Sequence, residues 1–167
     1  MHEWLELALI MGTAPLILIS PLLLAVAYCD LRYMRIPNLL SLLALALFLA
    51  FALIFPSADF LSKIMAAAAV MLLGFIGFCF RLLGGGDVKI LSALMLFVPT
   101  QSLMLFAFVF SASLLIGIAA ILALRKLPLA AGHRWKSVSG SNKFPMGISI
   151  ALAGIAHPFA LMLLPSV

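Results

Sequence analysis

The chain has 167 residues, of which 66% are hydrophobic and only 9% are charged. Soluble domains average about half apolar and about a quarter charged residues, so this composition excludes an ordinary soluble domain and indicates one compact membrane domain. The net charge of +5 comes from ten Lys and Arg residues against five acids, and no basic segment is large enough to form a nucleic-acid-binding module. We therefore expect membrane lipid, and no nucleic acid, around this chain.

Six apolar segments follow one another along the chain. A helix needs about 20 apolar residues to cross a bilayer, with a range of about 17–25. The acidic N-terminal residues are unlike the basic start of a cleaved signal peptide, so we expect the first segment to be retained. The fourth segment is short because Pro99 interrupts it, which leaves either a short span or a re-entrant piece. The expected spans are 7–29, 39–55, 64–80, 87–101, 102–124 and 144–164.

The distribution of Lys and Arg favours a crossing fourth segment. If all six segments cross and the N-terminus lies outside, nine of the ten cations lie on the cytoplasmic side, in agreement with the positive-inside rule. A re-entrant fourth segment would move the five cations after residue 124 to the outside. The sequence therefore predicts an all-α membrane protein with six transmembrane helices and both termini outside. The cytoplasmic cations are then Arg32, Arg35, Arg81, Lys89, Arg125, Lys126, Arg134, Lys136 and Lys143, and Lys63 lies outside.

Two of the five acids lie at the same depth in this topology. Asp30 follows the first span going inward and Asp87 begins the fourth span going outward, whereas Glu3, Glu6 and Asp59 lie outside. Two carboxylates that share a site cannot easily both ionise, so the pair holds one proton. The ionised carboxylate can then take a proton from water while the protonated one polarises a carbonyl, which suits peptide hydrolysis.

Each acid also has a simpler interpretation. Asp30 can be a solvated interfacial charge, and Asp87 with Lys89 can be an ion pair at a helix start, where an acid favours the helix dipole. The glycines before Asp87 would let a substrate backbone come close and would let the link adopt positive φ angles. No metal-ligand cluster and no phosphate-binding loop is present in the sequence, so we expect no metal and no cofactor.

The stretch around Asp87 resembles a motif of membrane proteases. Gly84, Gly85, Gly86 and Asp87 fit G-x-G-D, the motif of intramembrane aspartyl proteases. With Lys89 two residues later, the stretch is similar to the G-x-G-D-x-K block of type IV prepilin peptidases. Presenilin-like proteases share G-x-G-D but carry a Tyr-Asp motif, and here Cys29 precedes Asp30, so the prepilin peptidases are the better match.

Two further blocks resemble that family in the same order along the chain. Asp30 with Arg32 and the following Ile-Pro-Asn, which ends at Asn38, resembles the family's other acidic block at the end of a membrane helix. Phe-Pro-Met-Gly, with its proline at Pro145, resembles the start of the family's last helix. The resemblance implies that Asp30 and Asp87 are the catalytic pair. Gly84, Gly85, Gly86, Lys89, Asn38 and Pro145 are the residues that we expect to bind substrate or support the site.

The resemblance also implies an activity and a location. Members of the family cut the basic leader from prepilins and pseudopilins at the cytoplasmic face of the bacterial inner membrane, typically just after a glycine. Larger members carry a domain linked to methylating the new N-terminus, and its C-x-x-C motifs are absent here, so we expect no methylation. The small size is similar to the short enzymes of tight-adherence (Flp-type) pilus systems, so pilus or secretion assembly proteins are candidate partners.

Two functions of other classes remain as alternatives. A small proton-coupled transporter would also carry intramembrane acids and glycine breaks, but would place them near the middle of the bilayer. A non-catalytic pilus-assembly subunit would keep its function after either aspartate is replaced by asparagine.

Overall fold

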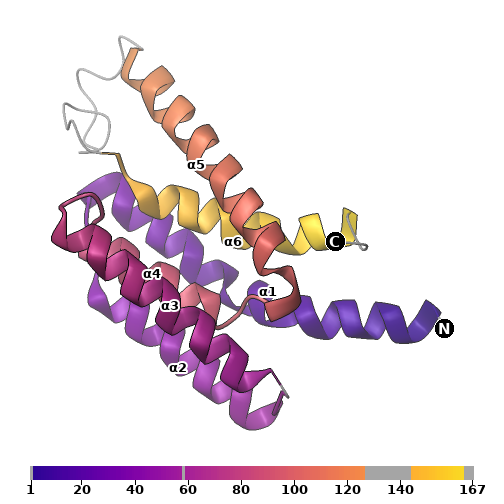
Figure 1. The fold of residues 1–167 in the computed structure, drawn as a ribbon. Coiled ribbons are helices and arrows are strands. Elements are labelled where there is room, and N and C mark those ends of the chain that lie inside the picture. The colour runs from indigo at the N-terminus through magenta and orange to yellow at the C-terminus, as the bar shows by residue number, and fades with distance from the viewer. Residues whose placement is uncertain (1, 58, 127–143, 164–167) are drawn as a thin grey trace.

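The computed structural model describes residues 2–57, 59–126 and 144–163, and in these residues it is entirely helical. Figure 1 shows a group of roughly aligned helices, from which the helix that ends at residue 126 leans away and the N-terminal end of the first helix projects. Its elements are α1 (His2–Tyr33), α2 (Asn38–Ile54), α3 (Phe60–Cys79), α4 (Gly85–Met95), the short 3-10 helix η1 (Thr100–Ser102), α5 (Leu103–Lys126) and α6 (Met146–Leu163).

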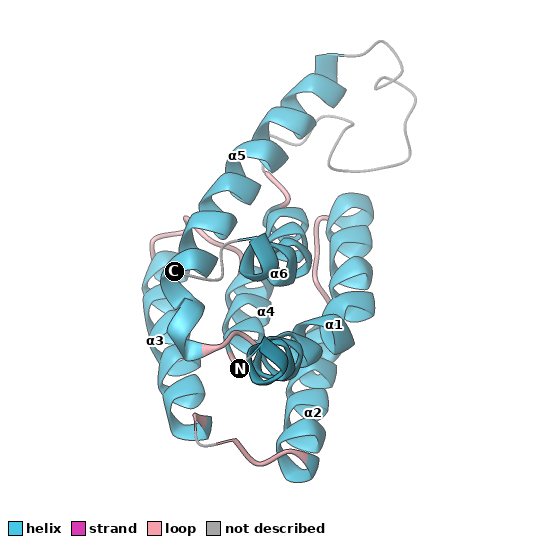
Figure 2. Cartoon of the chain, turned by 90° about the vertical axis from the view of Figure 1, so that its right-hand side faces the viewer, coloured by secondary structure: helices cyan, strands magenta, loops and turns pink. Residues whose placement is uncertain are grey.

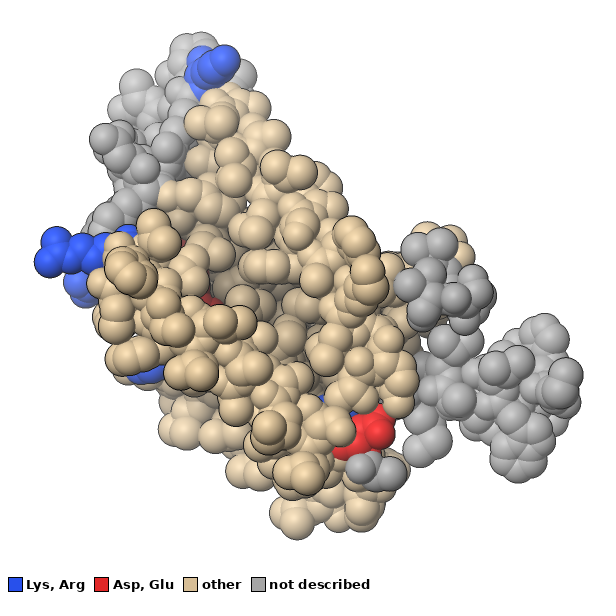
Figure 3. Space-filling model, viewed as in Figure 1, with Lys and Arg blue, Asp and Glu red and all other residues tan. Residues whose placement is uncertain are grey.

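Four helical segments in the described part of the chain are long and apolar enough to cross a membrane. They are Thr13–Tyr33, Phe60–Cys79, Thr100–Leu124 and Met146–Leu163, and the apolar helix α2 is shorter. The expectation of an all-helical membrane protein is confirmed at this level. Figure 3 shows Lys and Arg atoms at the end of the molecule where α1 ends and α4 begins, and at the end of α5, with an acidic patch near the opposite end.

Helix α1 carries its buried side chains on one face. Leu16, Ile19, Leu23 and Val26 are fully buried, and their spacing of three and four residues keeps them on the same side of the helix. Asp30 is the next position in this series and is buried with them. The expected polar link beginning at Asp30 is therefore wrong, because the helix continues to Tyr33 and the chain turns only at 34–37.

Helix α6 lies antiparallel to α1 and presents small residues to it. A Cβ atom on Gly154 would lie 2.5 Å from Leu23 Cδ1, and one on Gly147 would lie 2.8 Å from Asp30 Oδ2. The two glycines are one heptad apart, as are the residues that they face, so a single register brings both pairs together. The missing side chains of Gly147 and Gly154 thus let α6 pack closely on α1.

Helix α4 lies in the middle of the bundle (Figure 2) and packs against α2, α3 and α6. Ile90, Leu94, Phe97 and Val98 are completely buried, so the short fourth segment is enclosed by protein along most of its length. Backbone that leaves the helical form is tolerated at membrane depth only where protein or water covers it. This burial explains how the chain can leave the α-helix after Met95 without exposing its peptide groups to lipid.

The end of the fourth segment returns to the turn between α2 and α3. Gln101 donates a hydrogen bond from Nε2 to Asp59 Oδ2 at 3.1 Å. Asp59 immediately precedes α3, whereas α4 begins beside the end of α3, where a Cβ on Gly77 would touch Leu83. Residues 85–101 therefore cover the same height of the bundle as α3.

A buried polar pair joins the end of this segment to α6. The Ser102 hydroxyl donates to the Pro99 carbonyl at 3.0 Å and lies 3.0 Å from His157 Nε2. The tautomer of His157 sets which of the two groups donates in this contact. His157 is fully buried and its ring packs edge-on against Phe106, with centroids 5.4 Å apart.

We expect Ser102→Ala to destabilise the protein by about 1–3 kcal/mol, because it removes a hydrogen-bond partner from a buried imidazole. The measurement is the free energy of unfolding in detergent, from denaturant titration. Ser111→Ala is the matched control: the Ser111 hydroxyl is exposed on α5 and bonds only to the preceding turn, at Ala107 O. The control should change stability by less than about 0.5 kcal/mol. Equal losses in the two variants would contradict the structural role of the Ser102–His157 pair.

Candidate active site

A cavity of about 470 Å³ lies at the end of the bundle where α1 ends and α4 begins. It is lined by both aspartates of the predicted pair, by the α1–α2 link and by the glycines before Asp87. These residues are Asp30, Met34, Arg35, Ile36, Pro37, Asn38, Gly84, Gly85, Gly86 and Asp87. The structure thus places in one cavity two acids that are far apart in the sequence.

Helix α1 delivers Asp30 to this cavity on its buried face. Only 5% of the Asp30 surface is exposed. The backbone N–H of Gly147, in the first turn of α6, donates a hydrogen bond to Asp30 Oδ2 at 2.6 Å. The first N–H groups of a helix have no partner within the helix, so Asp30 occupies a donor that α6 leaves free. This bond, donated by the neighbouring helix α6, fixes the orientation of the Asp30 carboxylate.

Asp87 is held by the start of its own helix. Gly84 is the N-cap of α4, and the Gly84 backbone N–H hydrogen-bonds to the Asp87 carboxylate three residues later. This is the backward half of a capping box, in which an acid at the third helical position satisfies the N-cap N–H. The Asp87 Oδ1 atom is buried and has no hydrogen-bond partner among the described residues. Asp30 is close enough to act on the Asp87 carboxylate electrostatically.

The glycines before Asp87 serve close packing and not an unusual backbone conformation. None of Gly84, Gly85 and Gly86 has a positive φ, so the expectation of positive φ in this link is wrong. The positive angles fall on Arg81, at 59°, and on Met34, at 55°. These two residues reverse the chain after α3 and after α1, which leaves the glycine stretch free to start α4 directly.

Each of the three glycines faces a different neighbour. A Cβ on Gly84 would lie 2.5 Å from Asp87 Oδ2, and one on Gly86 would lie 3.1 Å from Ile36 Cβ and 3.3 Å from the Ile36 carbonyl oxygen. On Gly85 a Cβ would make only an ordinary contact, 3.4 Å from Phe78. Gly84 therefore leaves room for the Asp87 side chain, and Gly86 lets the α1–α2 link pack on the start of α4.

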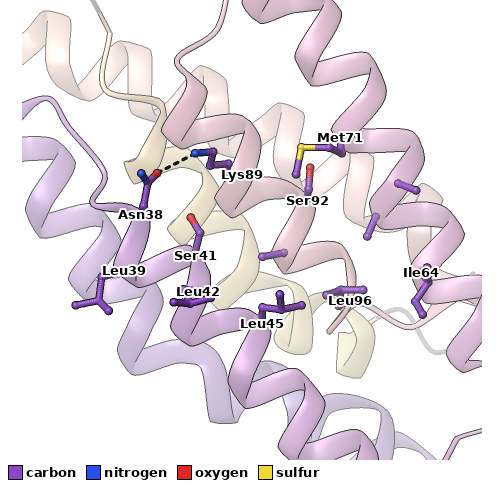
Figure 4. Close-up of a pocket in the computed structure, with 13 residues that line it drawn as sticks. Asn38, Leu39, Ser41, Leu42, Leu45, Ile64, Met71, Lys89, Ser92 and Leu96 are labelled. Carbon is purple, nitrogen blue, oxygen red and sulfur yellow. Dashed lines mark hydrogen bonds between the residues drawn. The ribbon is translucent and has the colours of Figure 1, made fainter.

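The remaining predicted site residues are divided between the cavity and its surroundings. Lys89 donates a hydrogen bond from Nζ to Asn38 Oδ1 at 3.0 Å (Figure 4), so its hydrogen bond goes to the start of α2 and not to Asp87. The alternative interpretation of Lys89 and Asp87 as an ion pair is thus wrong, because Lys89 bridges α4 to α2. Pro145 is buried directly before α6 and does not line the cavity.

Gly147 is a site residue that was not among the residues predicted from the sequence. The Gly147 N–H donates a hydrogen bond to Asp30, and the missing side chain of Gly147 leaves space for the Asp30 carboxylate. The signal was present in the Phe-Pro-Met-Gly block, because that block ends on this glycine. What sequence could not supply was the register between α1 and α6.

The two carboxyl groups in this cavity suit proton transfer. Within residues 2–57, 59–126 and 144–163, no three His, Cys, Asp or Glu side chains gather into a metal-binding group. Two carboxylates in one partly enclosed cavity can share a proton and act together on a water molecule and a carbonyl.

A model of the type IV leader peptidase family matches residues 17–124. The chain belongs to this family. It is therefore a protease of the leader peptidase type, and the match includes both Asp30 and Asp87 but not the start of α6. A search of curated proteins and a search of solved structures found no match to the chain.

We expect Gly84→Ala to lower the proteolytic rate of this leader peptidase by about tenfold or more, because the added methyl group collides with the Asp87 carboxylate. Gly85→Ala makes the same change one residue later, where the methyl group meets only the Phe78 ring at van der Waals distance. It should keep activity within about threefold. Leader-peptide cleavage by purified variants is the measurement, and a Gly85→Ala loss as large as that of Gly84→Ala would contradict this account.

We expect Gly147→Ala to impair cleavage more than it impairs folding. Its methyl group would lie 2.9 Å from Asp30 Cβ and 2.8 Å from Asp30 Oδ2, so the carboxylate has to move. A misplacement of about 1 Å at a group that takes part in the reaction can cost about 100-fold in rate. Gly154→Ala is the control, because it crowds the flexible end of Leu23 on the same helix face without touching Asp30. If both variants lose activity in proportion to stability, Gly147 has only a packing role.

Proposed function

We propose that this leader peptidase family member is an aspartic endopeptidase that removes the leader of prepilins or pseudopilins at the cytoplasmic face of the bacterial inner membrane. The observation that carries the proposal is the shared cavity of Asp30 and Asp87, at one end of a bundle of apolar helices. A cavity at the end of the bundle also favours hydrolysis over transport, since a transporter would place its acids near the middle of the helices.

The two acids divide the work of hydrolysis between them. With one proton shared by the pair, the ionised carboxylate takes a proton from a water molecule, whose oxygen attacks the carbonyl carbon of the scissile peptide. The protonated carboxyl donates a hydrogen bond to the carbonyl oxygen as negative charge develops there. The proton taken from water then passes to the leaving nitrogen as the C–N bond breaks, and the pair again holds one proton. The titration belongs to the pair, so neither aspartate is assigned the base role alone.

The protein environment prepares the pair for this chemistry. Gly147 N–H holds Asp30, and Gly84 N–H holds Asp87, each through a backbone group that cannot rotate away. The buried Oδ1 atom of Asp87, which has no hydrogen-bond partner among the described residues, is the atom that we expect to take part in sharing the proton. Preorganised groups of this kind lower the barrier because little rearrangement is needed during reaction.

We also propose six membrane crossings with both termini outside. The hydrogen bond between Gln101 and Asp59 supports the fourth crossing, because it ties the end of residues 85–101 to the level where α3 begins. The fourth segment covers this height with few residues, since α4 is followed by a non-helical stretch that rises more per residue. In this topology Asp30, Asp87 and the basic end of the bundle face the cytoplasm.

We expect Asp30→Asn and Asp87→Asn each to reduce cleavage of a prepilin substrate by about 10²–10⁴-fold, because either change removes the shared proton. The measurement is processing of a co-expressed prepilin, followed by mass shift. Asp59→Asn is the matched control, since Asp59 lies at the other end of the bundle and bonds to Gln101.

The control variant should process the prepilin at the wild-type rate. Normal processing by either of the first two variants would exclude the paired-aspartate mechanism. Unchanged pilus output with both variants would instead identify a non-catalytic assembly role.

A further inference from the structure

A second cavity, an apolar groove of about 900 Å³, opens between α2 and α3 beside the active site. Near the turn that connects α2 and α3, the Phe48 and Phe60 rings stack with centroids 5.8 Å apart. Closer to the active site, residues of both helices form the walls of the groove and α4 forms the floor between them (Figure 4). The groove is lined by Asn38, Leu39, Ser41, Leu42, Leu45, Ile64, Ala67, Ala68, Met71, Lys89, Ser92, Ala93 and Leu96.

The groove has a polar end and an apolar end. Asn38 and Lys89, joined by their hydrogen bond, form the polar end. Leu45 and Leu96 lie seven residues further along α2 and α4, which is two helical turns, or about 10 Å. Asn38 also lines the catalytic cavity, so the polar end of the groove is continuous with the site that holds Asp30 and Asp87.

The groove is open to the surrounding lipid and shaped for another helix. Leu42 is 62% exposed and Met71 42% exposed on its two walls. The small residues Ala67, Ala68 and Ala93 lie along it and allow a close backbone approach, as is usual where membrane helices pack. A peptide at this depth must satisfy its own backbone hydrogen bonds, so it has to be helical.

We infer that this groove binds an apolar helix of the substrate that begins directly after the peptide bond to be cut. The inference rests on the proposed leader-peptidase function, and it names the part of the substrate that holds the bond over the two aspartates. The basic leader cannot enter an apolar groove, so it stays on the aqueous side of the cavity. Asn38 marks the point where the chain passes from the cavity into the groove.

Two reporters separate helix binding from catalysis. Both carry the same short basic leader and glycine; one continues into an apolar Leu/Ala helix of about 20 residues, and the other into a flexible polar tail. Ala68→Phe fills the groove. Ala69→Phe is the matched control, because Ala69 is the next residue on α3, is also exposed and does not line the groove.

For Ala68→Phe we expect kcat/KM on the helical reporter to fall about tenfold or more, mainly through a higher KM, with the polar reporter changed less than about twofold. Ala69→Phe should change neither reporter by more than about twofold. Equal losses on both reporters, or no loss on the helical reporter, would overturn the groove as a substrate site. A wild-type chain that cleaves neither reporter would instead refute the proposed peptidase function.

Photo-crosslinking identifies the occupant without requiring turnover. A photoreactive residue at Leu42 or Met71, in an Asp87→Asn background, should cross-link to the helical reporter. The same residue at Leu115, which is 71% exposed on α5, should give a yield at least about fivefold lower. Cross-links from the groove only to lipid, or only to a second copy of this chain, would overturn the inference.

Discussion

The contact between α1 and α6 is the constraint on which the site depends. Asp30 continues the series of buried positions on α1, so it can face inward only if the opposing helix leaves room and supplies a polar partner. Gly147 does both, because it has no side chain and its N–H has no partner within its own helix. One heptad away, Gly154 meets Leu23 in the same register. The packing that stabilises the bundle therefore also sets the position of the Asp30 carboxylate.

The second acid is positioned by a different device. Asp87 lies in the first turn of α4 and is restrained by the helix N-cap at Gly84, so its place is set locally. Helix α4 is itself fixed by burial among α2, α3 and α6. One acid thus depends on long-range packing and the other on local capping, and the cavity forms only where both requirements are met. The Gly86 contact with Ile36 joins the two parts, because it packs the α1–α2 link on the start of α4.

Sequence was sufficient for the class of fold and for the pair of acids, because composition and the G-x-G-D stretch are local signals. The sequence did not predict the features that depend on packing between helices. The length of the first apolar run predicted a span that ends before Asp30. In the structure the helix continues to Tyr33, because residues of a helix outside the bilayer need not be apolar. Charge proximity along the chain suggested that Lys89 serves Asp87, but the nearest acceptor in space is Asn38, which lies 51 positions away.

The short fourth segment follows from these requirements. A carboxylate at the start of a lipid-facing helix would be exposed to the bilayer, whereas α4 is enclosed by three helices for most of its length. Enclosure in turn permits a segment too short to cross as a regular α-helix, because the protein, and not lipid, surrounds its non-helical end. Between α2 and α3 the enclosure opens, next to Asn38. The opening along α4 therefore lies beside the cavity that holds the two aspartates.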